Sequence, residues 1–193
     1  MLSVLDQPDL RQRISRLSVA EYHQLGEYNE RGKRTELIRG IAVEKMSKSP
    51  LHGTIASLLQ DIIAAQLPSG FCLRREEPLT FRDSEPEPDL AIVSGKRIDF
   101  LHAHPSTAML VVEVAVTSPE ADRALSELYA EAGVDEYWVV LPRECVIEVY
   151  RNPAGLRYGE MRAYTRAEHL ECLKIPGVKI SLPELFAALS TGE

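Results

Sequence analysis

Two short apolar stretches decide the fold of this chain: Pro86-Glu-Pro-Asp-Leu-Ala-Ile-Val93 and Met109-Leu-Val-Val-Glu-Val-Ala-Val116. Each is typical of a buried β-strand that carries one acidic residue, Asp89 at the start of the first and Glu113 in the middle of the second. A lone carboxylate among apolar residues is costly to bury unless it is paired or coordinated. We therefore expect Asp89 and Glu113 to face each other across two strand ends and to hold a divalent metal.

Predicted helices and strands alternate around these two stretches. Residues 52–67 carry apolar side chains at helical spacing, residues 71–81 follow as a strand, and residues 120–132 form a second helix. Strands at 136–141 and 146–151 make a hairpin. This order predicts an α/β sheet with helices on its faces. The apolar stripe of the first helix consists of Ile55, Leu58, Leu59, Ile62, Ile63 and Leu67.

The ends of the helices are marked by local signals. Pro50 suits the first turn of the first helix. Pro119 suits the first position of the second helix, Ser118 or Thr117 can cap it, and Gly133 ends it.

Smaller elements flank this region on both sides. Ser18 and Glu21 have the spacing of a capping box, which predicts a short helix that ends near Gly26. A loop follows over residues 27–34, and residues 35–46 form a β-hairpin that turns at Arg39-Gly40. Residues 152–180 are expected to form another hairpin with connections, and residues 183–189 a final short helix.

Length and composition set the broad class. The 193 residues suit one domain over residues 1–193, with residues 1–17 as an extended or flexible arm. With 45% hydrophobic and 26% charged residues the chain is typical of a soluble globular protein. The N-terminus lacks a signal-peptide pattern. The sequence contains no run of 18 apolar residues, so no membrane span is expected. Three widely spaced cysteines favour reduced thiols and a cytoplasmic location. The net charge of -7 disfavours a generic phosphate-binding surface but is compatible with a local metal site.

An ordered string of short motifs runs through most of the chain. It consists of Thr35-Glu-Leu-Ile-Arg-Gly40, His52-Gly53, Glu85-Pro-Glu-Pro-Asp-Leu90, His104-Pro105, Val112-Glu-Val-Ala115, Asp122-Arg123, Leu128-Tyr-Ala-Glu-Ala-Gly-Val134, Glu136-Tyr-Trp138 and Val149-Tyr-Arg151. This string resembles the PD-(D/E)XK nuclease superfamily. More closely, it is similar to the bacterial family of putative restriction endonucleases that was formerly filed as a domain of unknown function.

The resemblance implies a restriction-endonuclease-like core, in which helices flank a central mixed β-sheet, with an N-terminal helix and a β-hairpin as additions. It implies a Mg²⁺- or Mn²⁺-dependent DNA endonuclease that hydrolyses phosphodiester bonds. Asp89 and Glu113 would be the metal ligands, and His52 or Glu36 would complete the site. A homodimer is expected, because cutting duplex DNA takes two sites and two-fold dimers are the commonest oligomers.

The chain departs from this pattern at the catalytic lysine. The position two residues after Glu113 is Ala115, and the alternative lysine position on the following helix holds Leu125. An aliphatic side chain cannot stabilise charge on a phosphate, so Lys45, Lys48 or Arg75 would have to supply the cation from another element. The alternative function is a catalytically impaired nuclease-fold protein that binds nucleic acid or a protein partner.

Each candidate residue also has a structural interpretation. Asp89 follows a proline, as aspartates that end turns often do. Glu113 would be solvated if its strand lay at the edge of the sheet. His52 has the position of a residue near a helix cap, and His102 and His104 lie in a loop without ligand-like neighbours.

Overall fold

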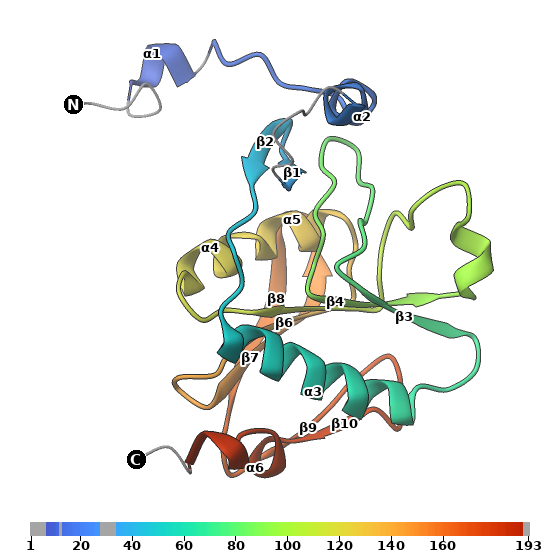
Figure 1. Ribbon diagram of the computed structural model, residues 1–193, viewed down its shortest axis with the longest axis vertical. Helices are drawn as coiled ribbons and strands as arrows, with labels where there is room; N and C mark the ends of the chain where they lie inside the picture. Colours follow the sequence, from blue (N-terminus) through green and yellow to red (C-terminus); the bar gives the residue numbers. More distant parts are fainter. Residues whose placement is uncertain (1–6, 12, 28–33, 191–193) are drawn as a thin grey trace. The chain divides into compact units, whose positions relative to one another are not determined.

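The computed structural model describes residues 7–11, 13–27 and 34–190 (Figure 1). It divides into two compact units, one of Met1–Met46 with Arg82–Pro86 and the other of Ser47–Phe81 with Glu87–Glu193. One domain over residues 1–193 stays a prediction. Residues 1–6 and 12 of the expected N-terminal arm and residues 28–33 of the expected loop lie outside the described residues. Within the arm, Pro8–Arg11 form the short helix α1.

The smaller unit contains the helix that the capping box predicts. Helix α2 spans Val19–Glu27, and the backbone N–H of Ser18 donates to Glu21 Oε2 at 2.8 Å. In return, the backbone N–H of Glu21 donates to Ser18 Oγ at 3.2 Å. The two bonds satisfy backbone donors that the first helical turn leaves open, so this local prediction is confirmed.

The predicted hairpin of the smaller unit is also confirmed. Strands β1 (Thr35–Ile38) and β2 (Ile41–Glu44) pair antiparallel. The turn residues Arg39 and Gly40 have φ values of 52° and 76°. Two consecutive positive φ angles match the twist of the flanking strands, which is why a glycine is favoured in this turn.

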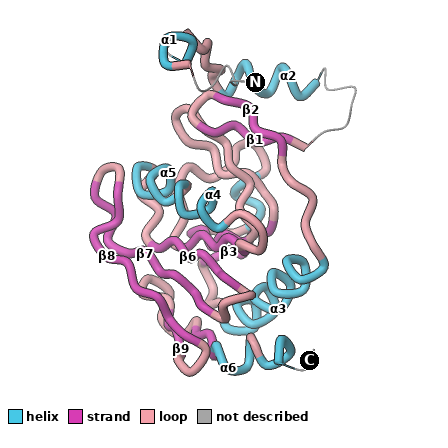
Figure 2. Tube along the Cα trace, turned by 90° about the vertical axis from the view of Figure 1, so that its left-hand side faces the viewer, coloured by secondary structure: helices cyan, strands magenta, loops and turns pink. Residues whose placement is uncertain are grey.

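The larger unit is built on a six-stranded mixed sheet in the order β3-β4-β5-β6-β7-β8. Strands β5 and β6 are parallel, and the other neighbouring pairs are antiparallel. The two longest strands, β7 and β8, run side by side as a hairpin (Figure 2). The strands are β3 (Phe71–Arg75), β4 (Leu90–Ser94), β5 (Leu110–Val114), β6 (Glu136–Leu141), β7 (Val146–Ala154) and β8 (Arg157–Thr165).

Helices cover both faces of this sheet (Figure 1). The parallel pair β5 and β6 requires a crossover connection, which contains α4 (Pro119–Ala124) and α5 (Ser126–Glu131). Helix α3 (Pro50–Gln66) packs on the opposite face. Side chains alternate between the faces along each strand, so Val112 joins the core under α3 and Val111 joins the core under α5.

The start of α3 and most of its apolar stripe match the prediction. Pro50 is the first helical residue, and Ser49 caps the helix by accepting a bond from the backbone N–H of His52 at 3.2 Å. Leu58 was expected in the buried stripe but is 36% exposed, because it lies on the outer side of the helix. The buried residues of α3 are Ile55, Ala56, Leu59 and Ile63.

Two predicted boundaries are wrong. Strand β3 ends at Arg75 rather than Phe81, because Glu76 has a φ of 51° and its backbone N–H turns to the carbonyl oxygen of Pro88. The predicted helix 120–132 divides at Leu125, and Ser118 makes no side-chain bond to its first turn. Both features depend on contacts or backbone angles that the apolar pattern does not encode.

The C-terminal part closes the core beneath α3. Strands β9 (His169–Glu171) and β10 (Lys179–Ser181) pair antiparallel, and α6 (Leu182–Leu185) follows them. Short 3₁₀ helices lie at Arg97–Phe100 and Ala187–Ser190. None of the helices in the described ranges combines the length and the hydropathy that crossing a membrane requires.

Candidate metal centre

The structure brings Asp89 and Glu113 together where β4 and β5 separate. Leu90 pairs with Val112, so the next position along the ladder places Asp89 opposite Glu113. At this position carboxylate oxygens, instead of backbone carbonyl oxygens, accept the hydrogen bonds between the strands. The N–H of Val114 donates to Asp89 Oδ2 at 2.8 Å, and the N–H of Asp89 donates to Glu113 Oε2 at 3.1 Å. Each carboxylate is thereby bonded to the backbone of the other strand.

Two basic side chains bind the carboxylate of Asp89. Lys48 Nζ donates to Oδ1 at 2.6 Å, and His52 Nε2 donates to Oδ2 at 2.9 Å. Burial of Asp89 by itself raises its pKa, but the hydrogen bond from His52 and the positive charge of Lys48 outweigh burial and lower the pKa to about 2. Asp89 is therefore ionised at neutral pH.

The imidazole of His52 is held with one nitrogen toward Asp89. A carboxylate only accepts hydrogen bonds, so Nε2 carries the proton in this pair. The other nitrogen, Nδ1, is buried and has no hydrogen-bond partner among the described residues, and the side chain is 12% exposed. The geometry therefore makes His52 a support for the carboxylate rather than a group with access to solvent.

Lys48 connects Asp89 to a second carboxylate. Its Nζ lies 3.0 Å from Glu76 Oε1 as well as 2.6 Å from Asp89 Oδ1. Partial burial lowers the pKa of Lys48, but the charges and hydrogen bonds of Asp89 and Glu76 outweigh burial and raise it overall, so the ammonium stays protonated. Glu76 Oε1 also lies 3.7 Å from Arg75 Nε. Sequence reasoning named Lys48 as one of three basic candidates and missed Glu76.

The side chain of Glu113 is held by a residue of α5. The hydroxyl of Tyr129, a fully buried residue of α5, donates to Glu113 Oε1 at 3.0 Å. Leu125 packs against the apolar cluster around Tyr129, so the position where relatives were expected to carry lysine is part of this cluster. Sequence reasoning missed Tyr129, although a buried tyrosine hydroxyl needs a polar partner and Glu113 was an available one.

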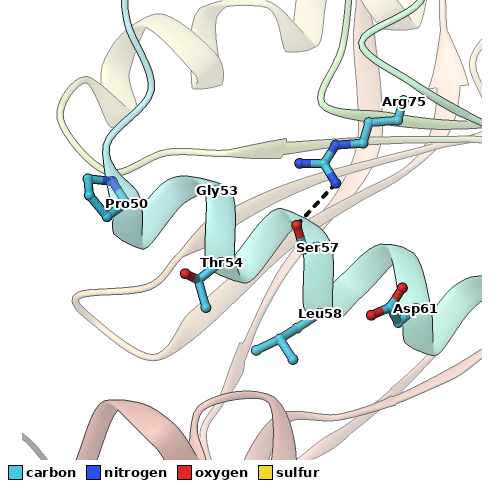
Figure 3. Close-up of a pocket in the computed structure, with 7 residues that line it drawn as sticks. All are labelled: Pro50, Gly53, Thr54, Ser57, Leu58, Asp61 and Arg75. Carbon is cyan, nitrogen blue, oxygen red and sulfur yellow. Dashed lines mark hydrogen bonds between the residues drawn. The ribbon is translucent and has the colours of Figure 1, made fainter.

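A shallow groove of about 560 Å³ follows the outer side of α3 (Figure 3). Arg75 extends over this side of the helix and donates to Ser57 Oγ at 3.1 Å. Gly53 contributes no side chain, and apart from its chain neighbours and the backbone of its own helix no atom lies within 4 Å of the place its Cβ would occupy. The groove is lined by Pro50, Gly53, Thr54, Ser57, Leu58, Asp61 and Arg75.

Glu36 belongs to the smaller unit, where its Oε2 is 3.9 Å from Lys45 Nζ. His104 is exposed and accepts a bond from Arg74 at 3.2 Å, which agrees with a structural role, and His102 is exposed. Among the residues that the structure describes, no three His, Cys, Asp or Glu side chains form a group that could hold a metal ion.

Comparison with known proteins agrees with this architecture. The family model described as "Uma2: Putative restriction endonuclease" matches residues 19–183. A crystal structure described as "a putative nuclease belonging to DUF820" from Anabaena variabilis ATCC 29413 is 18% identical, covers 90% of this chain and 99% of its own, and superposes with a TM-score of 0.70. No curated protein matches the chain. The predicted α/β fold, with a mixed central sheet, flanking helices and the N-terminal helix and hairpin, is confirmed.

Proposed function

We propose a specific reaction and site for this chain, which belongs to the family described as Uma2 putative restriction endonucleases. Membership supports a nuclease-like function on nucleic acid in general. The reaction that we propose is hydrolysis of phosphodiester bonds in DNA with Mg²⁺ or Mn²⁺ as the cofactor. The metal ligands would be Asp89 and Glu113.

The observation that carries this proposal is the meeting of two carboxylates at one strand end, each bonded to the backbone of the other strand at 2.8 and 3.1 Å. Mg²⁺ and Mn²⁺ prefer carboxylate oxygens, and Mg²⁺ commonly binds through one or two carboxylates with water and substrate phosphate in the other positions. Asp89 and Glu113 therefore fit such an ion in kind and number. When bound, the ion would polarise the phosphate and lower the pKa of a coordinated water.

The other residues of the site act on the two carboxylates. Val114 and His52 donate to the same oxygen of Asp89, and Tyr129 donates to Glu113 Oε1. These bonds fix the orientation of both groups before any substrate arrives, which limits the reorganisation that catalysis requires. We therefore assign His52 as a positioning residue for Asp89.

A plasmid-nicking assay with Mg²⁺ and with Mn²⁺ tests the proposal. The variants Asp89→Asn and Glu113→Gln keep the size of each side chain but remove its charge, and each is expected to lower cleavage at least about 100-fold. Glu127→Gln is the control, because Glu127 is an exposed residue of α5. Cleavage by Asp89→Asn and Glu113→Gln at the rate of the control would reject this site.

Leu125 favours a second candidate function, a nuclease fold that binds nucleic acid without cutting it. Its signature would be DNA binding that weakens steeply with salt, together with no cleavage in either metal. A homodimer also stays a proposal, and light scattering at monomer mass over a wide concentration range would remove it.

A further inference from the structure

We infer that Lys48 supplies the positive charge that a lysine at position 125 would provide, since this chain has leucine there. We also infer that Glu76 keeps Lys48 at the site when a cation occupies Asp89. The inference rests on the proposed function and identifies a further catalytic residue for that reaction. Lys48 lies in the loop that precedes α3, far in sequence from both lysine positions of the family pattern. The contacts of its ammonium group carry the argument.

The ammonium of Lys48 lies between two carboxylates. Nζ is 2.6 Å from Asp89 Oδ1 and 3.0 Å from Glu76 Oε1, and the side chain is 27% exposed. A lysine ammonium has three hydrogen-bond donors, so two are engaged here and the third can reach a ligand. Lys48 is thus both anchored and accessible, whereas His52 on the same carboxylate is nearly covered at 12% exposure.

A divalent cation and the ammonium would compete for Asp89 Oδ1. The divalent cation and the ammonium would repel each other strongly if both bound this oxygen in a partly buried site. Glu76 gives Lys48 a second anion within hydrogen-bonding distance, so Lys48 can release Oδ1 without leaving the site. The donor that is released is then available to bind a phosphate oxygen.

Glu76 is held in place by its own backbone and by its neighbour. Its φ of 51° turns its N–H toward the carbonyl oxygens of Pro88 and Asp89, at 3.1 and 3.3 Å. A non-glycine residue in this region is uncommon and persists where its surroundings determine it. Arg75, whose Nε lies 3.7 Å from Glu76 Oε1, is itself anchored on α3 through Gln60 at 2.7 Å.

The role of Lys48 in the reaction is electrostatic. Hydrolysis forms a bond between the water oxygen and phosphorus and breaks one phosphorus–oxygen ester bond, while the water releases a proton to solvent and the leaving oxygen takes one up. Lys48 stays protonated throughout and stabilises the negative charge that develops on the phosphate oxygens.

Calorimetric titration of the full-length chain with Mn²⁺ alone gives a readout that does not depend on cleavage. Lys48→Met removes the competing ammonium, so Mn²⁺ is expected to bind about tenfold more tightly than to the wild type. Lys48→Arg keeps the charge and is expected to bind within about threefold of the wild type. Unchanged or weaker binding to Lys48→Met, or equally tightened binding to Lys48→Arg, would overturn the inference.

Cleavage kinetics then separate this inference from the proposed function. Lys48→Met is expected to lower kcat at least about 100-fold with KM nearly unchanged, and Lys48→Arg to restore part of the loss. Glu76→Gln is expected to weaken Mn²⁺ binding, because Lys48 then stays on Asp89. Wild-type kcat in Lys48→Met contradicts the role of Lys48, whereas loss of cleavage confined to Asp89→Asn and Glu113→Gln supports the metal site alone. If the wild type itself does not cleave, the proposed function fails and the Mn²⁺ titration still decides whether Lys48 competes for Asp89.

Discussion

Replacement of Asp89 by asparagine should cost stability in a pH-dependent way. The pKa of Asp89 falls from 3.8 to about 2 in the folded chain, because Lys48 and His52 bind the charged form. At 1.36 kcal/mol for each pKa unit, this difference corresponds to roughly 2 kcal/mol of folding free energy at neutral pH. The folded pKa is the lower one, so ionised Asp89 stabilises the fold fully above pH 3.8 and the contribution disappears as the pH falls through about 2.

Urea denaturation with a chelator present measures this contribution directly. The difference in unfolding free energy between the wild type and Asp89→Asn should be about 2 kcal/mol at pH 7 and about half of that at pH 3. Asp61→Asn is the matched control, because Asp61 is an exposed aspartate of α3, and it should change stability by less than about 0.5 kcal/mol.

Two results would refute the reasoning about Asp89. One is an Asp89→Asn variant that is as stable as Asp61→Asn at pH 7. The other is a difference between wild type and Asp89→Asn that stays constant down to pH 3. Either result would mean that Lys48 and His52 do not stabilise the charge on Asp89.

Three further substitutions, two beside the site and one at the buried Glu136, can be tested by chemical denaturation. Gly53→Ala should raise the unfolding free energy by about 0.5 to 1 kcal/mol, because its Cβ meets no atom within 4 Å in a helix; a loss would show that the groove is narrower than described. Tyr129→Phe removes the donor to Glu113 and should cost about 1 kcal/mol; unchanged stability would contradict that bond. Glu136→Gln should cost about 3 to 5 kcal/mol, since Glu136 is fully buried and pairs with Arg151 at 3.1 Å; a cost below about 1 kcal/mol would mean that Arg151 does not need the charge.

Much of the fold follows from short-range patterns. The capping box at Ser18, the turn at Arg39-Gly40 and the proline at the start of α3 each depend on residues that are a few positions apart, and each was predicted. The strands β4 and β5 were also evident, because their central residues are apolar on both faces. Leu58 was misplaced because helical spacing alone does not mark which edge of an apolar stripe meets the sheet.

The site could be predicted only in part. Asp89 and Glu113 stand out because a carboxylate is rare in an apolar strand, and the register then brings them together. Lys48 was one of three candidates, since its contact with Asp89 joins residues 41 positions apart through a loop whose path the sequence does not determine. Glu76 gave no signal, because its role depends on a positive φ that only the folded chain reveals.

The exchange of bonds between Asp89, Glu113 and the opposite backbones has a practical consequence for genetics. Alanine at either position would remove the acceptor of a backbone N–H and open the end of the sheet. A null phenotype in cells could then come from loss of catalysis or from loss of folded protein. Asparagine and glutamine keep an oxygen for that N–H. They therefore disturb the strand end less than alanine does. The protein level of Asp89→Asn must still be measured beside its phenotype, because the lost charge lowers stability at pH 7.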